Sequence, residues 1–188
     1  ELFEYQPEDL SYREGQITAF ARPMKVQRVE GTAAVFEDRV TLDMRNDIDV
    51  VLMRQDPPFD MAYITACHLL ELLKPATPVL NDPEHVRSGP EKLYPLLLPE
   101  FMPPTRISRD RSEIQAFRDD HKDVIVKPLY GFGGGDVFRV KPEDSNFGPL
   151  IELFLGRTRE PLIVQAFLPA VADGDKRIIL IDGEVIGG

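Results

Sequence analysis

The segment Val124–Val140, V-I-V-K-P-L-Y-G-F-G-G-G-D-V-F-R-V, indicates the fold of this chain more strongly than any other stretch. An apolar strand ends at Lys127, four glycines follow within five positions, and a second strand returns. Glycine adopts positive φ without steric cost and lets backbone N–H groups come close to an anion. The pattern therefore predicts a β-hairpin whose loop, Gly131–Asp136, can fold over phosphates while Lys127 points a positive charge at their oxygens.

This glycine loop differs from the two best-known phosphate-binding loops. No Gly-Lys-Ser/Thr follows it, so it is not a Walker motif. It also fails the dinucleotide fingerprint, because Asp136 stands where the third glycine belongs and a strand follows in place of a helix. Two readings remain for the loop and its lysine: a flap over a triphosphate, or a plain flexible hairpin tip beside a surface lysine.

Short helical and strand-like segments alternate around the loop, as expected of an α+β unit. The predicted helices are Pro90–Leu98, Asp110–His121 (with Ile114 and Phe117 inward) and Asn146–Leu155. The predicted strands are Thr105–Ile107, Asp123–Lys127, Val137–Val140 and Leu162–Ala166, followed by a hairpin of Lys176–Ile181 and Glu184–Ile186 around Asp182 and Gly183.

The first half of the chain has a different rhythm. Ile48–Arg54 is a continuous apolar run, typical of a strand buried on both faces. Phe59–Lys74 has helical length and one apolar face, and Pro78–Leu80 is a second short strand. Asp82 can cap a further helix that Pro83 opens. This order predicts a βαβ layer with a parallel sheet.

Two more strand-like segments, Gln16–Val29 and Ala33–Val40, precede that layer. We predict a boundary near residues 86–90, with an N-terminal α/β domain at 1–88 and a second domain at 89–188. The glycine-loop subdomain of the second domain is expected at 89–168. Because the chain begins at Glu1 and stops at Gly188 directly after a strand-like segment, we expect it to be incomplete.

Composition excludes several classes of protein. The 188 residues carry 22 Lys and Arg against 32 Asp and Glu, a formal net charge of −10 that disfavours a nucleic-acid partner. The longest aliphatic runs are four residues, whereas a membrane span needs about 20, so no membrane segment is expected. Cys67 is the single cysteine, which excludes an internal disulfide and suits a reducing cytoplasm.

Other candidate residues are weak signals when each is taken alone. Lys92 is ordinarily a solvated helix lysine, and Gln165–Pro169 is ordinarily a strand that ends at a proline. The same segment could offer backbone groups to an adenine edge, with Phe167 and Leu168 as walls. Asp175 and Arg177 either belong to a solvated turn or project into a site. The three histidines show no ligand spacing, so we assign no metal ligand.

Taken jointly, these segments resemble the bacterial glutathione synthetase family of the ATP-grasp superfamily. The matching motifs are R-Q-D-P-P-F-D-M-A-Y-I-T-A (54–66), N-D-P (81–83), E-K-L (91–93), M-P-P-T (102–105), K-P-L-Y-G-F-G-G-G-D-V-F-R-V (127–140), Q-A-F-L-P (165–169) and D-G-D-K-R-I-I-L-I-D-G-E (173–184). They occur in the family's order and cover most of the chain from about residue 48. The resemblance implies an incomplete N-terminal α/β (pre-ATP-grasp) domain, followed by part of an ATP-grasp fold that clasps a nucleotide.

The resemblance also implies an ATP-dependent ligase that joins γ-glutamylcysteine to glycine through an acyl phosphate, making glutathione. By resemblance, Arg177 acts at the reacting phosphoryl group. The implied nucleotide contacts are Lys92, Lys127, Gly131, Gly133, Gly134 and Gly135 at the phosphates, Gln165, Phe167 and Leu168 at adenine, and Asp175 at the ribose. The family's Mg²⁺ ligands are expected beyond residue 188, so we expect this exact chain to be inactive.

Two alternatives stay open: another ATP-grasp carboxylate–amine ligase, or a non-catalytic ATP-binding regulatory module. The family is commonly oligomeric, so a homo-oligomer is expected. Asp136 departs from the family pattern, which usually has a small neutral residue there. A carboxylate beside a triphosphate is repulsive unless it faces away.

Overall fold

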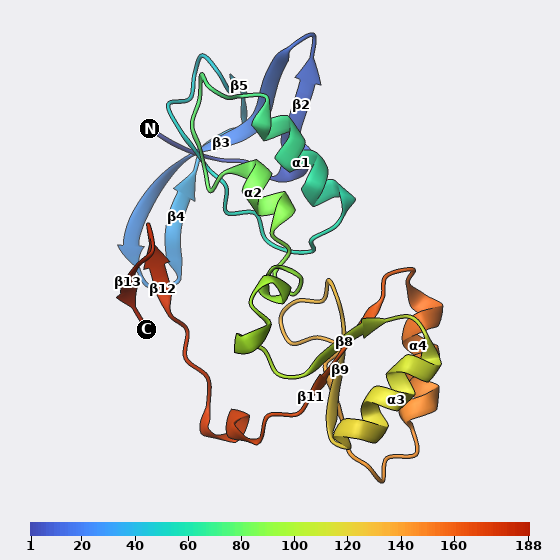
Figure 1. Cartoon of the computed structure of the whole chain (residues 1–188). Coiled ribbons are helices and arrows are strands. Elements are labelled where there is room, and N and C mark those ends of the chain that lie inside the picture. Colours follow the sequence, from blue (N-terminus) through green and yellow to red (C-terminus); the bar gives the residue numbers. More distant parts are fainter. The chain divides into compact units, whose positions relative to one another are not determined.

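The computed structural model describes residues 1–188 as two compact units, Glu1–Leu97 and Leu98–Gly188 (Figure 1). Each unit has its own buried hydrophobic cluster. The strands of the first unit are β1 (Leu2–Glu4), β2 (Leu10–Arg13), β3 (Gln16–Val29), β4 (Thr32–Phe36), β5 (Val40–Asp43), β6 (Val51–Leu52) and β7 (Val79–Leu80). Its helices are α1 (Met61–Glu71) and α2 (Pro83–Ser88), with 3-10 turns η1 (Pro7–Asp9) and η2 (Tyr94–Leu97).

The long strand β3 organises the antiparallel sheet of the first unit. Its first half pairs with β2 and β5, and its second half pairs with β1 and β4. The predicted strand over 16–29 is confirmed, whereas the predicted strand Ala33–Val40 is wrong, because β4 and β5 are separate. β2 turns into β3 at Glu14 and Gly15, which both have positive φ (50° and 89°), as a tight hairpin requires.

A βαβ layer follows, as predicted, with β6 and β7 parallel and α1 between them in sequence. The Asp60 side chain caps α1 by accepting from the Tyr63 N–H at 2.9 Å. Cys67 lies fully buried on the inner face of α1, and burial raises the pKa of its thiol. Cys67 therefore packs as one of the apolar core residues of this unit.

Two further predictions in this unit are wrong. Ile48–Arg54 is not buried on both faces, because Val51 is buried whereas Val50 and Leu52 are 44% and 61% exposed. The core cluster that contains Val51 lies on one side of β6, so its residues alternate. Pro90–Leu98 is not a regular helix but ends in the 3-10 turn η2. Pro95 lacks the N–H that an α-helix would use there.

The second unit is built on a four-stranded antiparallel sheet in the order β10–β9–β11–β8. Its strands are β8 (Thr105–Ser108), β9 (Val124–Pro128), β10 (Phe138–Val140), β11 (Leu162–Ala166), β12 (Ile179–Ile181) and β13 (Glu184–Gly187). Its helices are α3 (Arg111–His121) and α4 (Phe147–Arg157), with 3-10 turns η3 (Pro99–Phe101) and η4 (Pro169–Asp173). These positions confirm the helices and strands predicted from Thr105 to Ala166, and the hairpin around Asp182 and Gly183.

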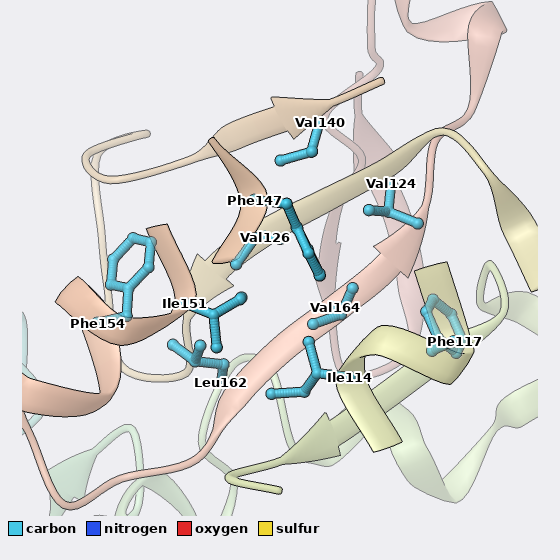
Figure 2. Packing of buried hydrophobic residues seen from close by; sticks show 10 residues of the cluster. All are labelled: Ile114, Phe117, Val124, Val126, Val140, Phe147, Ile151, Phe154, Leu162 and Val164. Carbon is cyan, nitrogen blue, oxygen red and sulfur yellow. The ribbon is translucent and has the colours of Figure 1, made fainter. Parts of the chain in front are cut away.

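Both helices of the second unit pack on one face of this sheet, as Figure 2 shows. The helices contribute Ile114, Phe117, Phe147, Ile151 and Phe154, and the strands contribute Val124, Val126, Val140, Leu162 and Val164. Every one of these side chains is at most 8% exposed. One face of the sheet is therefore buried against α3 and α4, and the opposite face does not belong to this core.

Two arginines tie the helices to the loops around them. Arg118 on α3 donates to the carbonyls of Lys141, Pro142 and Asp144 at 2.8–3.0 Å, and its guanidinium lies 4.5 Å from the centre of the Phe147 ring. Arg109 donates to three carbonyls at and beyond the end of α4, which would otherwise lack helical partners.

The chain contains no helix that is both long and apolar enough to cross a membrane.

The core of the second unit yields a stability prediction. Ile151 and Leu153 lie on the same helix, but Ile151 is 3% exposed and Leu153 is 49% exposed. We expect Ile151→Ala to lower the free energy of unfolding by about 2–5 kcal/mol, because it leaves a cavity beside the valines of β9 and β11. The matched control Leu153→Ala should cost well below that. Urea denaturation measures both, and equal costs would contradict the assignment of this face as the core.

Candidate functional site

The strand register places a second set of residues on the sheet face opposite the helices. Because neighbouring strand residues point to opposite faces, Ile125 and Lys127 alternate with the core valines of β9. We call this surface the front face. It is formed by Thr105, Ile107, Ile125, Lys127, Arg139, Ile163 and Gln165.

Pairing across the strands then orders the front face. Arg139, Ile125, Gln165 and Thr105 form one row across the four strands, because each is the partner of the next. Lys127 lies opposite Ile163, one row nearer to the glycine loop. The structure thus brings Lys127 and Gln165, predicted from separate motifs, to neighbouring strands of one face.

The glycine loop starts from a tightly packed position. A Cβ on Gly131 would lie 2.7 Å from Cγ of Pro128, so a larger residue does not fit there. Gly133 and Gly134 have positive φ of 59° and 72°, and the Gly135 N–H donates to the Phe132 carbonyl at 3.1 Å. The loop conformation therefore requires glycine at specific positions for two reasons, close approach and backbone handedness.

Gln165 is held in place on the front face. Its Nε2 donates to Oγ1 of Thr105 at 2.9 Å, and that hydroxyl donates to the Pro103 carbonyl at 2.7 Å. The Gln165 amide oxygen remains an acceptor that a ligand can use. A side chain oriented by its neighbours in this way can recognise a ligand without first being ordered.

The backbone after β11 has fewer available donors than the sequence suggested. The Ala166 N–H donates to the Pro104 carbonyl at 3.0 Å, and the Phe167 N–H donates to the Asp123 carbonyl at 2.9 Å. The next N–H along the chain belongs to Leu168, whose side chain is 53% exposed. A ligand edge along this segment would therefore meet Leu168 before the other N–H groups.

Sequence reasoning named Phe167 but missed its two partners at this end of the front face, Arg139 and Asp123. Arg139 donates from Nε and Nη2 to the two carboxylate oxygens of Asp123, at 3.0 and 2.6 Å. Its guanidinium carbon lies 3.5 Å from the centre of the Phe167 ring. The hydrogen bonds from Arg139 lower the pKa of the Asp123 carboxyl. The available signal was the alternation in Phe138–Val140, which places Arg139 opposite the core.

The carboxylate of Asp136, the residue that departs from the family pattern, lies beside an arginine of α4. Its Oδ1 lies 3.9 Å from Nη1 of Arg157, a residue of the last turn of α4. α4 packs on the far face of the sheet, so this carboxylate is turned toward the helix side. Both side chains are 55% exposed, so the pair contributes little to stability.

Three of the predicted site residues lie outside this sheet. Lys92 belongs to the first unit, where its side chain is 16% exposed and its Nζ lies 3.9 Å from a Glu91 carboxylate oxygen. Asp175 and Arg177 lie exposed on the irregular segment between η4 and β12. Their roles therefore stay predictions. No group of three or more His, Cys, Asp or Glu side chains is arranged to hold a metal ion.

Comparison with known proteins assigns this architecture. The solved structure of D-alanyl-alanine synthetase A from Vibrio cholerae shares the fold, with a TM-score of 0.54 and 16% identity over 94% of this chain and 53% of that chain. The domain that carries the front face and the glycine loop is an ATP-grasp domain. The chain belongs to the prokaryotic glutathione synthetase family, whose N-terminal domain matches residues 1–87 and whose ATP-grasp domain matches residues 91–188. The resemblance seen in the sequence is thereby confirmed.

Individual relatives agree with this assignment. The chain is 52% identical over 183 residues to a glutathione synthetase of Rhodopseudomonas palustris, and 48% identical over 188 residues to one of Bradyrhizobium diazoefficiens. Each comparison covers 97% of this chain and 58% of the relative. The chain therefore spans somewhat more than half the length of the curated relatives that it matches.

The packing at Gly131 yields a prediction for the loop. Gly131→Ala places a methyl group against the rigid Pro128 ring, so we expect the free energy of unfolding to fall by about 1–3 kcal/mol. The control is Gly156→Ala on α4, where an added Cβ meets nothing within 4 Å. That change should raise stability by up to about 1 kcal/mol, because alanine favours a helix. Thermal or urea unfolding compares the two, and a neutral Gly131→Ala would show that the close contact is not needed.

Proposed function

We propose that the protein is an ATP-dependent ligase that joins γ-glutamylcysteine to glycine, forming glutathione, ADP and phosphate. The observation that carries the proposal is the placement of Lys127 and Gln165 on one sheet face, with the glycine loop leading away from Lys127. The names of the relatives, all glutathione synthetases, support the substrates.

The reaction needs activation of a carboxylate, because an unmodified carboxylate has no good leaving group. ATP would transfer its terminal phosphoryl group to the cysteinyl carboxylate, with ADP leaving. The glycine nitrogen would then attack the carbonyl carbon of this acyl phosphate, expelling phosphate and losing a proton. Both steps depend on positioning and on offsetting negative charge more than on a covalent enzyme group.

The front face supplies residues suited to those tasks. Lys127 would offset phosphate charge, and the loop from Gly131 to Gly135 would cover the phosphates with backbone N–H groups. Gln165 lies one strand away and two residues closer to the base end, a separation of about 7 Å along the strand that a ribose can bridge. Phe167 and Leu168 continue the surface beyond it, as walls for the base.

Magnesium is general for ATP-dependent phosphoryl transfer, where it would offset the negative charge of the phosphates. The residues of this chain do not gather into a group that could hold it. We therefore assign magnesium to no residue here.

Three further roles rest on the family motifs alone. Lys92 is proposed at the phosphates, Asp175 at the ribose, and Arg177 at the reacting phosphoryl group.

The proposal also places the protein in the cytoplasm as a homo-oligomer. The single, buried cysteine supports a reducing compartment, since it offers no disulfide. The oligomer rests on the family alone, and light scattering at several protein concentrations tests it.

Turnover tests the reaction itself. The polypeptide of the full reading frame should release ADP when given ATP, magnesium, γ-glutamylcysteine and glycine, with glutathione as product. Another carboxylate–amine ligase would turn over with a different acceptor pair, such as two D-alanines. A binding module would take up ATP and release no ADP with any pair. Either result would overturn the proposed reaction.

Lys127 yields a prediction on nucleotide binding. Lys127→Ala removes a charge-assisted phosphate contact, which costs about 1.5–3 kcal/mol and weakens ATP binding roughly ten- to more than a hundredfold. Lys141→Ala, at an exposed lysine of the same unit, is the matched control and should leave affinity unchanged. Calorimetric titration measures both. An unaltered ATP affinity in folded Lys127→Ala protein would remove Lys127 from the site.

A further inference from the structure

We propose that Arg139 is a positioning residue for the nucleotide base: clamped by Asp123, it holds the Phe167 ring as a fixed wall of the site. This inference rests on the proposed function, because it assumes that a nucleotide binds on the front face. Neither Arg139 nor Asp123 belongs to the set of residues predicted from the family motifs.

The three residues form a closed set of contacts. Arg139 binds the Asp123 carboxylate with two parallel hydrogen bonds, a geometry that fixes the plane of the guanidinium. That plane covers the Phe167 ring at 3.5 Å. The Phe167 N–H in turn donates to the Asp123 carbonyl at 2.9 Å. Asp123 therefore holds the backbone of Phe167 directly and its ring through Arg139.

Position along the strands places this set at the base end. Asp123 lies four residues before Lys127, a distance of about 14 Å along an antiparallel strand. Arg139 lies in the row of Gln165, whereas the glycine loop begins beyond Lys127 on the opposite side. Arg139 thus lies about 7 Å along the strand from the row of Lys127, on the side of the expected base.

The chemistry of the contact suits a wall better than a phosphate ligand. Both carboxylate oxygens of Asp123 already accept hydrogen bonds from the guanidinium of Arg139. The positive charge of Arg139 is therefore largely offset by Asp123 and attracts a polyphosphate little. Phe167 follows β11, outside the strand ladder, so its ring depends on side-chain contacts for a single orientation. A guanidinium stacked on one face of the ring supplies that orientation, and a lysine cannot, because its ammonium is not planar.

The alternative is a purely structural role, in which the ion pair of Arg139 and Asp123 only stabilises the pairing of β10 with β9. This role predicts a loss of stability when Arg139 is replaced, and no loss of affinity that depends on the nucleotide base. Binding of ATP and of inorganic tripolyphosphate, which lacks the base, separates the two readings. The matched control is Arg106→Leu. Arg106 is an exposed strand arginine opposite Val164, on the helix side of the same sheet, with only a 3.9 Å ion pair to Glu113.

The experiment is calorimetric titration of the folded polypeptide of the full reading frame, and of its variants, with each probe. We expect Arg139→Leu to weaken ATP binding about five- to thirtyfold and to leave tripolyphosphate binding within twofold of wild type. Arg139→Lys should recover only part of the loss. Phe167→Leu should weaken ATP to a similar degree, and the double variant should lose no more than either single change, because both act on the same ring.

Several results would overturn the inference. They are unchanged ATP affinity in Arg139→Leu, an equal loss for tripolyphosphate, full recovery by Arg139→Lys, or additive losses in the double variant. If Arg139→Leu does not fold, an unchanged ATP affinity in Phe167→Leu would also overturn the inference. A wild-type polypeptide of the full reading frame that binds neither probe would overturn the nucleotide site itself, and the proposed function with it.

Discussion

The pairing of β9 with β11 is the constraint on which the second unit depends. Five residue pairs join these strands, and alternate pairs face opposite ways. Val126 and Val164 close the core under α3 and α4, while Lys127 and Gln165 face the other side. The same pairing therefore buries one face of the sheet in the core and arranges the candidate site on the other face.

Local sequence patterns predicted most of this unit. Alternating apolar residues in the strands, the apolar face of the helix Asp110–His121 and the glycine run each act within about ten residues, so a single segment carries the full signal. In the first unit, β1 and β2 escaped prediction because they are three or four residues long and depend on β3 for their partners. The error at Ile48–Arg54 has a similar origin. An apolar run shows that burial is possible, but which side is covered depends on packing elsewhere in the chain.

The residues of the candidate site also differ in whether local sequence could predict them. Lys127 and Gln165 could be predicted because each lies in a motif that is continuous in sequence. The alternation in Phe138–Val140 could place Arg139 on the front face but could not predict its contacts, since its partners Asp123 and Phe167 lie 16 and 28 residues away and meet it only after the sheet has formed. Lys92, Asp175 and Arg177 are drawn from equally clear motifs, yet they lie outside the sheet that orders the others.

The alternation along β9 also bears on how the gene can change. A residue added to or lost from the tip between Phe132 and Asp136 alters a hairpin turn, and the strands on either side keep their pairing. A residue added within β9 itself would shift the ladder by one position, turning Lys127 into the core and Val126 outward. Insertions and deletions within the five residues of β9 should therefore be lost because they misfold the sheet, whereas those at the glycine tip leave the fold intact and act only on the proposed phosphate contacts.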